Sequence, residues 1–178
     1  MNPPPVLCIA SFLPAAEAGE LYETLVRTVT WDERIRARGT ASFGTAYNYS
    51  DMTYPDVPMP PAIANVAARV HSQVGWLPNN CLANYYRDGK ATMGFHSDSE
   101  AGLEPETGVA IVSLGAAREL VFRAALDKTA EFRYLLPSGA LLVMPWGIQN
   151  DWRHGVPKAD EDAGGRISLT FRRVLDNL

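Results

Sequence analysis

The sequence predicts a mainly β protein of the α+β class, in which two antiparallel sheets are braced by helices near the N-terminus. Apolar residues recur with helical spacing before residue 80, and short β-rich runs separated by turn residues follow. A block of helices followed by a block of strands is typical of segregated folds. A chain of 178 residues that is 47% hydrophobic can bury a core without disulfides or a structural metal, so we expect one domain over residues 1–178.

Two segments of the N-terminal part carry the helical spacing. The first runs from Ala15 to about Val29 and the second from Ala62 to about Val74. Pro61 suits the first turn of the second helix, where its missing N–H leaves no hydrogen bond unmade. The apolar stripes are formed by Leu21, Leu25 and Val29 in the first helix, and by Ile63, Val66, Ala67 and Val70 in the second.

From residue 80 the sequence is a series of short runs rich in β-branched, aromatic and aliphatic residues. Turn signals such as Asp88-Gly89 and Gly164-Gly165 separate these runs. Many short strands with turns between them predict two packed antiparallel sheets. The predicted strands are CLANYY, GVAIVSL, ELVFRAAL, AEFRYLL, GALLVMP and RISLTFRRV.

Charge and composition narrow the function classes. The net charge of −4 argues against a generally basic surface, so any nucleic-acid binding must use a local patch. No apolar run approaches the ~20 residues that span a bilayer. The segment MNPPPVLCIASFLP lacks a basic start and is broken by Pro14, and the chain has two cysteines. We expect a soluble protein of the cytoplasm, or of the nucleus in a eukaryote, that is neither secreted nor bound to a membrane.

The segment GFHSDSE places His96, Asp98 and Glu100 on alternating positions. In an extended strand such residues share one face, so an imidazole and a carboxylate can bind one metal ion. His154, near the end of another β-rich run, could complete a set of two histidines and one carboxylate. Such a facial triad leaves coordination positions open, as in non-haem Fe(II) oxygenases, although zinc accepts the same ligands. The alternative is an exposed strand end with a solvated carboxylate.

Arg166 and Arg172 lie on one face of the run RISLTFRR, opposite its apolar residues. Two guanidiniums that point inward are costly unless anions meet them, and a dicarboxylate cosubstrate would supply both anions. The alternative is that these arginines lie on the outer side of an edge strand and pair with surface acids. The pattern alone leaves both arrangements open.

Between about Phe43 and Val174 the chain resembles the AlkB family of Fe(II)- and 2-oxoglutarate-dependent dioxygenases. The segments NYY..G......HSDSE, VSLGAARELVFR, LPSGALLVM, WRHGVPK and RISLTFRR each look like a segment of that family, in the family's order. The resemblance implies a double-stranded β-helix, or jelly roll, over about residues 80–178. It implies that about residues 1–79 form the helical support and the nucleotide-recognition lid. It also implies Fe(II), 2-oxoglutarate and O2, with His96, Asp98 and His154 as the iron ligands.

The resemblance also assigns the cosubstrate contacts. It implies that Arg166 and Tyr86 bind the distal carboxylate of 2-oxoglutarate, and that Arg172 and Asn84 bind the carboxylate near the iron. Ser168 stands where the family often has asparagine between its arginines. Serine can donate one hydrogen bond to a carboxylate but lacks the second partner of an amide, so we expect weaker cosubstrate binding without loss of activity.

For the substrate, the resemblance implies N-alkylated nucleobases whose methyl group leaves as formaldehyde. Tyr47, Tyr49 and Ser50 fall in the lid-like run, with Tyr49 stacking on the flipped base opposite His96 and Tyr47 forming a hydrogen bond. Both tyrosines could equally be core or hinge aromatics. Glu100 would accept a hydrogen bond from the exocyclic amino group of 1-methyladenine or 3-methylcytosine. Its alternative is a solvated acid on a loop.

The one evident basic run contains Arg34, Arg36 and Arg38, and contact with phosphates is plausible there, Arg38 included. A surface cluster at a helix end is the usual alternative. Trp31, just before this run, is either a wedge for a base stack or a core residue. Arg118 and Arg123 are weaker candidates for phosphate contact.

These observations predict a DNA-repair dioxygenase that demethylates DNA in preference to RNA, with nucleic acid as its partner and a monomer as its state. Two rivals remain. One is an AlkB-like dioxygenase that acts on RNA, protein or a small molecule, which the acidic net charge motivates. The other is a non-catalytic jelly-roll binding module in which His96 and Asp98 are merely structural.

Overall fold

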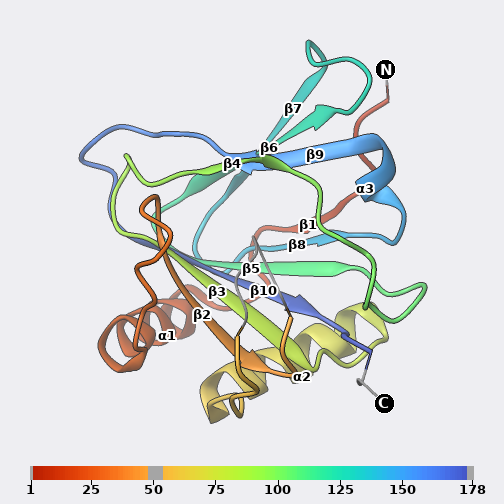
Figure 1. Ribbon diagram of the computed structural model, residues 1–178. Helices are drawn as coiled ribbons and strands as arrows, with labels where there is room; N and C mark the ends of the chain where they lie inside the picture. Colours follow the sequence, from red (N-terminus) through yellow and green to blue (C-terminus); the bar gives the residue numbers. More distant parts are fainter. Residues whose placement is uncertain (1, 48–53, 176–178) are drawn as a thin grey trace.

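The computed structural model describes residues 2–47 and 54–175, which form two antiparallel sheets facing each other (Figure 1). The larger sheet has the order β1 (Leu7–Ile9), β8 (Leu141–Met144), β5 (Val109–Gly115), β10 (Arg166–Arg172), β3 (Asn80–Tyr86) and β2 (Gly39–Gly44). The smaller sheet has the order β4 (Met93–His96), β9 (Trp152–Val156), β6 (Arg118–Ala124) and β7 (Glu131–Leu136). The predicted mainly β jelly-roll fold is confirmed.

Two helices cover the outer face of the larger sheet, below it in Figure 1. They are α1 (Ala15–Thr28) and α2 (Pro61–Val74), which match the two predicted segments to within a residue. The apolar stripes that predicted them are buried against the sheet. Helix α2 ends because Gly75 takes a left-handed conformation, with φ of 84°, and its N–H bonds to the carbonyl of His71.

The position of β10 decides the question about the two arginines. This strand lies between β5 and β3 in the middle of the larger sheet, so it is not an edge strand. Its apolar residues pack toward the helices, whereas its polar residues point between the sheets. Arg166 and Arg172 are only 1% and 2% exposed. The alternative of surface arginines on an edge strand is therefore wrong.

The six predicted strands are all present, and residues 2–47 and 54–175 contain four more strands that lie outside the predicted runs. Strand β2 consists largely of small residues and forms because it pairs along β3. Strand β1 is three residues long and pairs with β8. Strands β4 and β9 pair with each other, with an irregularity between Met93 and His96. Short or irregular strands carry little periodic signal, and the tertiary pairing decides them.

A third helix, α3 (Ile148–Asp151), links β8 to β9 through a single turn. Buried residues form one cluster between the helices and the larger sheet and a second between the two sheets. Across the part of the chain that the structure describes, no helix has the length and apolar character needed to cross a membrane. The functional residues lie at the second cluster, where the inner faces of the sheets meet.

Candidate metal centre and adjoining cavity

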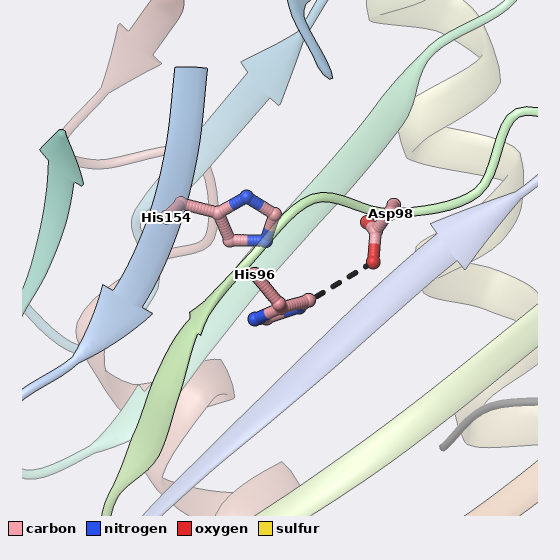
Figure 2. A group of neighbouring side chains, drawn as sticks. All are labelled: His96, Asp98 and His154. Atoms are coloured by element: carbon pink, nitrogen blue, oxygen red, sulfur yellow. Dashed lines mark ion pairs between the residues drawn. The ribbon is translucent and has the colours of Figure 1, made fainter. Parts of the chain in front are cut away.

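His96, Asp98 and His154 converge between the two sheets (Figure 2). His96 and His154 are directly opposite each other in the β4–β9 ladder, and their ring centroids are 4.4 Å apart. Asp98 follows two residues after the end of β4 and points toward both rings. One ligand atom from each residue lies within 4.8 Å of the others. The arrangement brings together the three residues that the sequence suggested as a facial triad.

Both imidazoles are in a form that can bind a cation. Nδ1 of His96 lies 2.9 Å from the carbonyl oxygen of Gly94. Because a carbonyl only accepts, this contact places a proton on Nδ1, and Nε2 is then the atom that offers a lone pair in the neutral ring. Burial lowers the pKa of His154 to about 4, so this ring is neutral near pH 7. The two imidazoles lie where their ring nitrogens can donate lone pairs to one ion.

Asp98 supplies the negative charge of the group. Its backbone and side chain are buried, and Nη2 of Arg172 donates to its Oδ2 at 2.9 Å. Burial alone would raise the pKa of Asp98, but the Arg172 guanidinium outweighs burial and holds this pKa well below its usual range. The carboxylate is therefore ionised.

The residues fit a bound divalent cation. Oδ1 of Asp98 and Nδ1 of His154 are buried and have no hydrogen-bond partner among residues 2–47 and 54–175. Oδ1 also lies 3.5 Å from Nε2 of His96. Buried polar atoms are costly without a partner, and a cation bound by this carboxylate and these imidazoles would offset that cost.

A cavity adjoins the triad and is lined from both sheets. Along β3 and β10 every second residue faces it, as the period of a strand requires. Its apolar walls come from Leu82 of β3 and from β4, β5, β6 and β9, and apart from the triad its polar residues come from β3 and β10. The lining residues are Leu82, Asn84, Tyr86, Met93, His96, Asp98, Ile111, Leu120, His154, Val156, Arg166, Ser168, Thr170 and Arg172.

Arg166 provides a cationic group in this cavity. Its Nε donates to Oγ of Ser113 at 2.9 Å, and its Cζ lies 5.2 Å from the centroid of the Tyr86 ring. Burial lowers its pKa. Nη1 of Arg166 is buried and has no hydrogen-bond partner within the described ranges. This guanidinium can therefore bind a carboxylate through Nη1. Ser113 of β5, which the sequence did not suggest, holds the guanidinium through its hydroxyl.

Asn84 and Ser168 are neighbours across the β3–β10 ladder, and both are buried in the cavity wall. Oδ1 of Asn84 accepts a hydrogen bond from Nε of Arg38 at 2.8 Å. Arg38 is itself buried and also reaches the carbonyl of Thr92 at 3.5 Å. Arg38 is thus buried next to a residue of the cavity wall, whereas Arg36 of the same basic run is exposed.

Tyr47 is buried, and its hydroxyl donates to the carbonyl of Ser99 at 3.1 Å. Cζ of Arg172 lies 4.5 Å from the centroid of the Tyr47 ring, so Tyr47 packs against an arginine of the cavity. Tyr49 and Ser50 lie outside the described residues. Glu100 is not simply a solvated acid on a loop, because its Oε1 accepts the N–H of Gly147 at 2.7 Å.

The remaining candidates for contact with nucleic acid have different surroundings in the structure. Arg118 is buried, and its guanidinium donates to three backbone carbonyls, so the proposed contact with phosphate is wrong for this residue. Arg123 pairs with Glu131, and Arg34 pairs with Asp32. The ring of Trp31 lies 5.1 Å from that of Tyr85 and packs on the core, as its alternative stated.

Two facing sheets around a two-histidine, one-carboxylate site, with a buried arginine in the same cavity, define the jelly-roll class of 2-oxoglutarate- and iron-dependent oxygenases. The family model of the 2OG-Fe(II) oxygenase superfamily matches residues 5–172. The chain belongs to the AlkB family within this superfamily, whose cofactors are Fe(II), 2-oxoglutarate and O2.

Comparison with curated relatives supports the same family. The chain is 31% identical over 182 residues to the alpha-ketoglutarate-dependent dioxygenase alkB homolog 3 of Rattus norvegicus, covering 92% of this chain and 62% of the relative. It is 30% identical to the DNA oxidative demethylase ALKBH2 of Homo sapiens, covering 90% and 70%. The chain thus spans about three fifths of the rat relative's length. The solved structure of OsALKBH1 shares the fold, with a TM-score of 0.69, 16% identity and coverage of 97% of this chain and 100% of the other.

Proposed function

We propose that this chain is an Fe(II)- and 2-oxoglutarate-dependent dioxygenase that demethylates N-alkylated nucleobases, in DNA in preference to RNA. The observation that carries the proposal is the single cavity that holds both the His96, Asp98 and His154 group and the unpartnered Nη1 of Arg166. The similarity to the rat dioxygenase and to the human DNA oxidative demethylase supports the reaction and the choice of DNA.

In this proposal His96, Asp98 and His154 hold the iron. Bound Fe(II), 2-oxoglutarate and O2 supply the oxidation of the methyl group, which leaves as formaldehyde while the cosubstrate becomes succinate and CO2. The chain contributes a shaped site between two sheets, in which Asp98 and His154 are buried and apolar side chains form part of the wall.

Arg166 and Tyr86 bind the distal carboxylate of the cosubstrate. The planar fork of a guanidinium suits a carboxylate, and Ser113 holds this fork by occupying Nε. We assign the carboxylate near the iron to Arg172 and Asn84, with Ser168 between Asn84 and Ser113 in the ladder. Since Ser168 has one hydroxyl to donate, cosubstrate binding is weaker than with asparagine there, and activity is retained.

On the substrate side, Glu100 reads the base. One of its carboxylate oxygens accepts the N–H of Gly147, and the carboxylate has a second oxygen that can accept from an exocyclic amino group. This preference favours 1-methyladenine and 3-methylcytosine. Tyr47, Tyr49 and Ser50 belong to the lid that holds the flipped base, and Arg38 contributes to the substrate side through its hydrogen bond to Asn84 of the cavity wall.

The proposal is tested with oligonucleotides that carry one 1-methyladenine or one 3-methylcytosine, as DNA and as RNA. Formaldehyde and succinate are measured together with the mass of the base. We expect equal amounts of both products and faster turnover on DNA. His96→Ala should abolish turnover, whereas His71→Ala, at an exposed position of α2, should not.

Two other results would contradict the proposal and favour its rivals. Succinate formation without loss of the methyl group would indicate a dioxygenase with another substrate, such as a protein or a small molecule. Absence of any divalent metal binding would indicate a non-catalytic jelly-roll module. The monomeric state and the cytoplasmic or nuclear location stay predictions, as does the single domain over residues 1–178.

A further inference from the structure

Asp98 lies in a segment that no strand partner holds. Strand β4 ends at His96, and residues 97–100 have no regular secondary structure. The backbone N–H of Asp98 is nevertheless satisfied, because it donates to Oε1 of Gln149 at 3.0 Å. A side chain therefore replaces the missing ladder partner at the residue that supplies the carboxylate of the triad.

Two more hydrogen bonds join the same two segments. Oγ of Ser97 donates to the carbonyl of Trp152 at 3.3 Å, and the N–H of Gly147 donates to Oε1 of Glu100 at 2.7 Å. The segment 97–100 is thus held at three points by the connection that runs through α3 into β9. Of these contacts, only the one with Gln149 reaches the ligand residue itself.

Gln149 also belongs to the chain segment that carries the second histidine, since His154 follows it by five residues. Ile148 anchors the helix that bears Gln149 in the core. The other end of the Gln149 amide is also held, because its Nε2 donates to Sδ of Met144 at 3.9 Å. One half-buried amide therefore couples the position of Asp98 to that of His154.

We propose that Gln149 is a positioning residue that fixes the Asp98 carboxylate for metal binding. Arg172 holds the carboxylate end of Asp98, and Gln149 holds its backbone end. With both ends held, rotation about the backbone cannot turn Oδ1 away from the two imidazoles. Groups that orient metal ligands in this way typically contribute about 10- to 100-fold to metal affinity. The inference rests on the metal site of the proposed function but not on the identity of the substrate.

The test is titration of the metal-free protein with Co(II) under anaerobic conditions, read by calorimetry and by the visible absorption of the bound ion. Gln149→Met keeps the length of the side chain and removes the acceptor. Gln149→Glu keeps an acceptor oxygen at the same position. Gln73→Met, at an exposed position of α2, is the matched control.

We expect Gln149→Met to bind Co(II) about 10- to 100-fold more weakly, with an altered absorption spectrum, under conditions in which metal-free unfolding shows that both the variant and the control are folded. Gln149→Glu should recover most of the affinity. Gln149→Asn, whose shorter side chain cannot span the same distance, should resemble Gln149→Met and serves if the latter does not fold.

Co(II) affinity and spectrum unchanged in Gln149→Met and Gln149→Asn would overturn the inference. A Gln149→Glu variant that binds Co(II) as weakly as Gln149→Met would also overturn the inference, because this variant keeps an acceptor oxygen and adds a negative charge that attracts the cation. If the unsubstituted protein binds no Co(II), the metal site itself and the proposed function are contradicted. If it binds Co(II) and the Gln149 variants bind equally well, only the role of Gln149 is contradicted.

Discussion

Nη2 of Arg172 lies 2.9 Å from Oδ2 of Asp98, and the two side chains are only 2% and 1% exposed. Arg172 is the last residue of β10 in the larger sheet, whereas Asp98 follows β4 of the smaller sheet. This buried ion pair thus joins the two sheets at the metal centre. A buried charge left without its partner is strongly destabilising, so the pair links the stability of the fold to the charge state of the site.

Arg172→Met should destabilise the metal-free protein by about 3–5 kcal/mol, because it leaves the Asp98 carboxylate buried without its cation. A divalent ion at the triad should restore part of this loss by compensating the same carboxylate. Urea unfolding with and without Mn(II) measures both effects. Arg173→Met is the matched control, since Arg173 pairs with Glu104 at the surface and should change stability by at most about 1 kcal/mol. Equal effects of the two substitutions would contradict the prediction.

His154→Ala should remove stoichiometric Co(II) binding. The substitution leaves one imidazole and one carboxylate, which are too few to hold the ion against water. Equilibrium dialysis followed by metal analysis measures the loss. His71→Ala should bind as the unsubstituted protein does, and retention of one tightly bound ion by His154→Ala would rule His154 out as a ligand.

Arg166→Met should raise the KM for 2-oxoglutarate, because charge-assisted hydrogen bonds contribute about 1.5–3 kcal/mol, or roughly 10- to 150-fold. The KM of Arg166→Lys should lie between those of the unsubstituted protein and Arg166→Met, since lysine keeps the charge but lacks the planar fork. Succinate formation at varied cosubstrate concentration gives the values. Arg133→Met, on the exposed surface of β7, is the control, and a KM for Arg166→Met equal to that of this control would refute the cosubstrate role.

Arg118→Met should lower stability by about 3 kcal/mol, because three part-buried backbone carbonyls lose a charged donor. It should leave the salt dependence of DNA binding unchanged, since the side chain does not reach the surface. Denaturant unfolding and binding titrations at several salt concentrations separate the two effects. A decrease of about one in the salt slope would instead indicate a phosphate contact.

Local periodicity predicted much of the fold. The apolar stripes gave both long helices, because a buried helix face repeats every three or four residues and this repeat is visible in the sequence. The alternation in β10 likewise showed that its arginines oppose Ile167 and Phe171. The strands that were missed, β1, β2, β4 and β9, are short, irregular or rich in small residues, and their pairing partners lie far away in the sequence.

The sequence alone determined which residue types were available for the site: two histidines, one aspartate between polar neighbours, and two arginines on one strand face. Only the tertiary structure decided how they are used. It separated Glu100 from the triad by giving its carboxylate the N–H of Gly147, and it buried Arg118 among carbonyls. Spacing along a strand determines the face on which a side chain lies, but the segments that pack against that face determine its partners, and these come from distant parts of the chain.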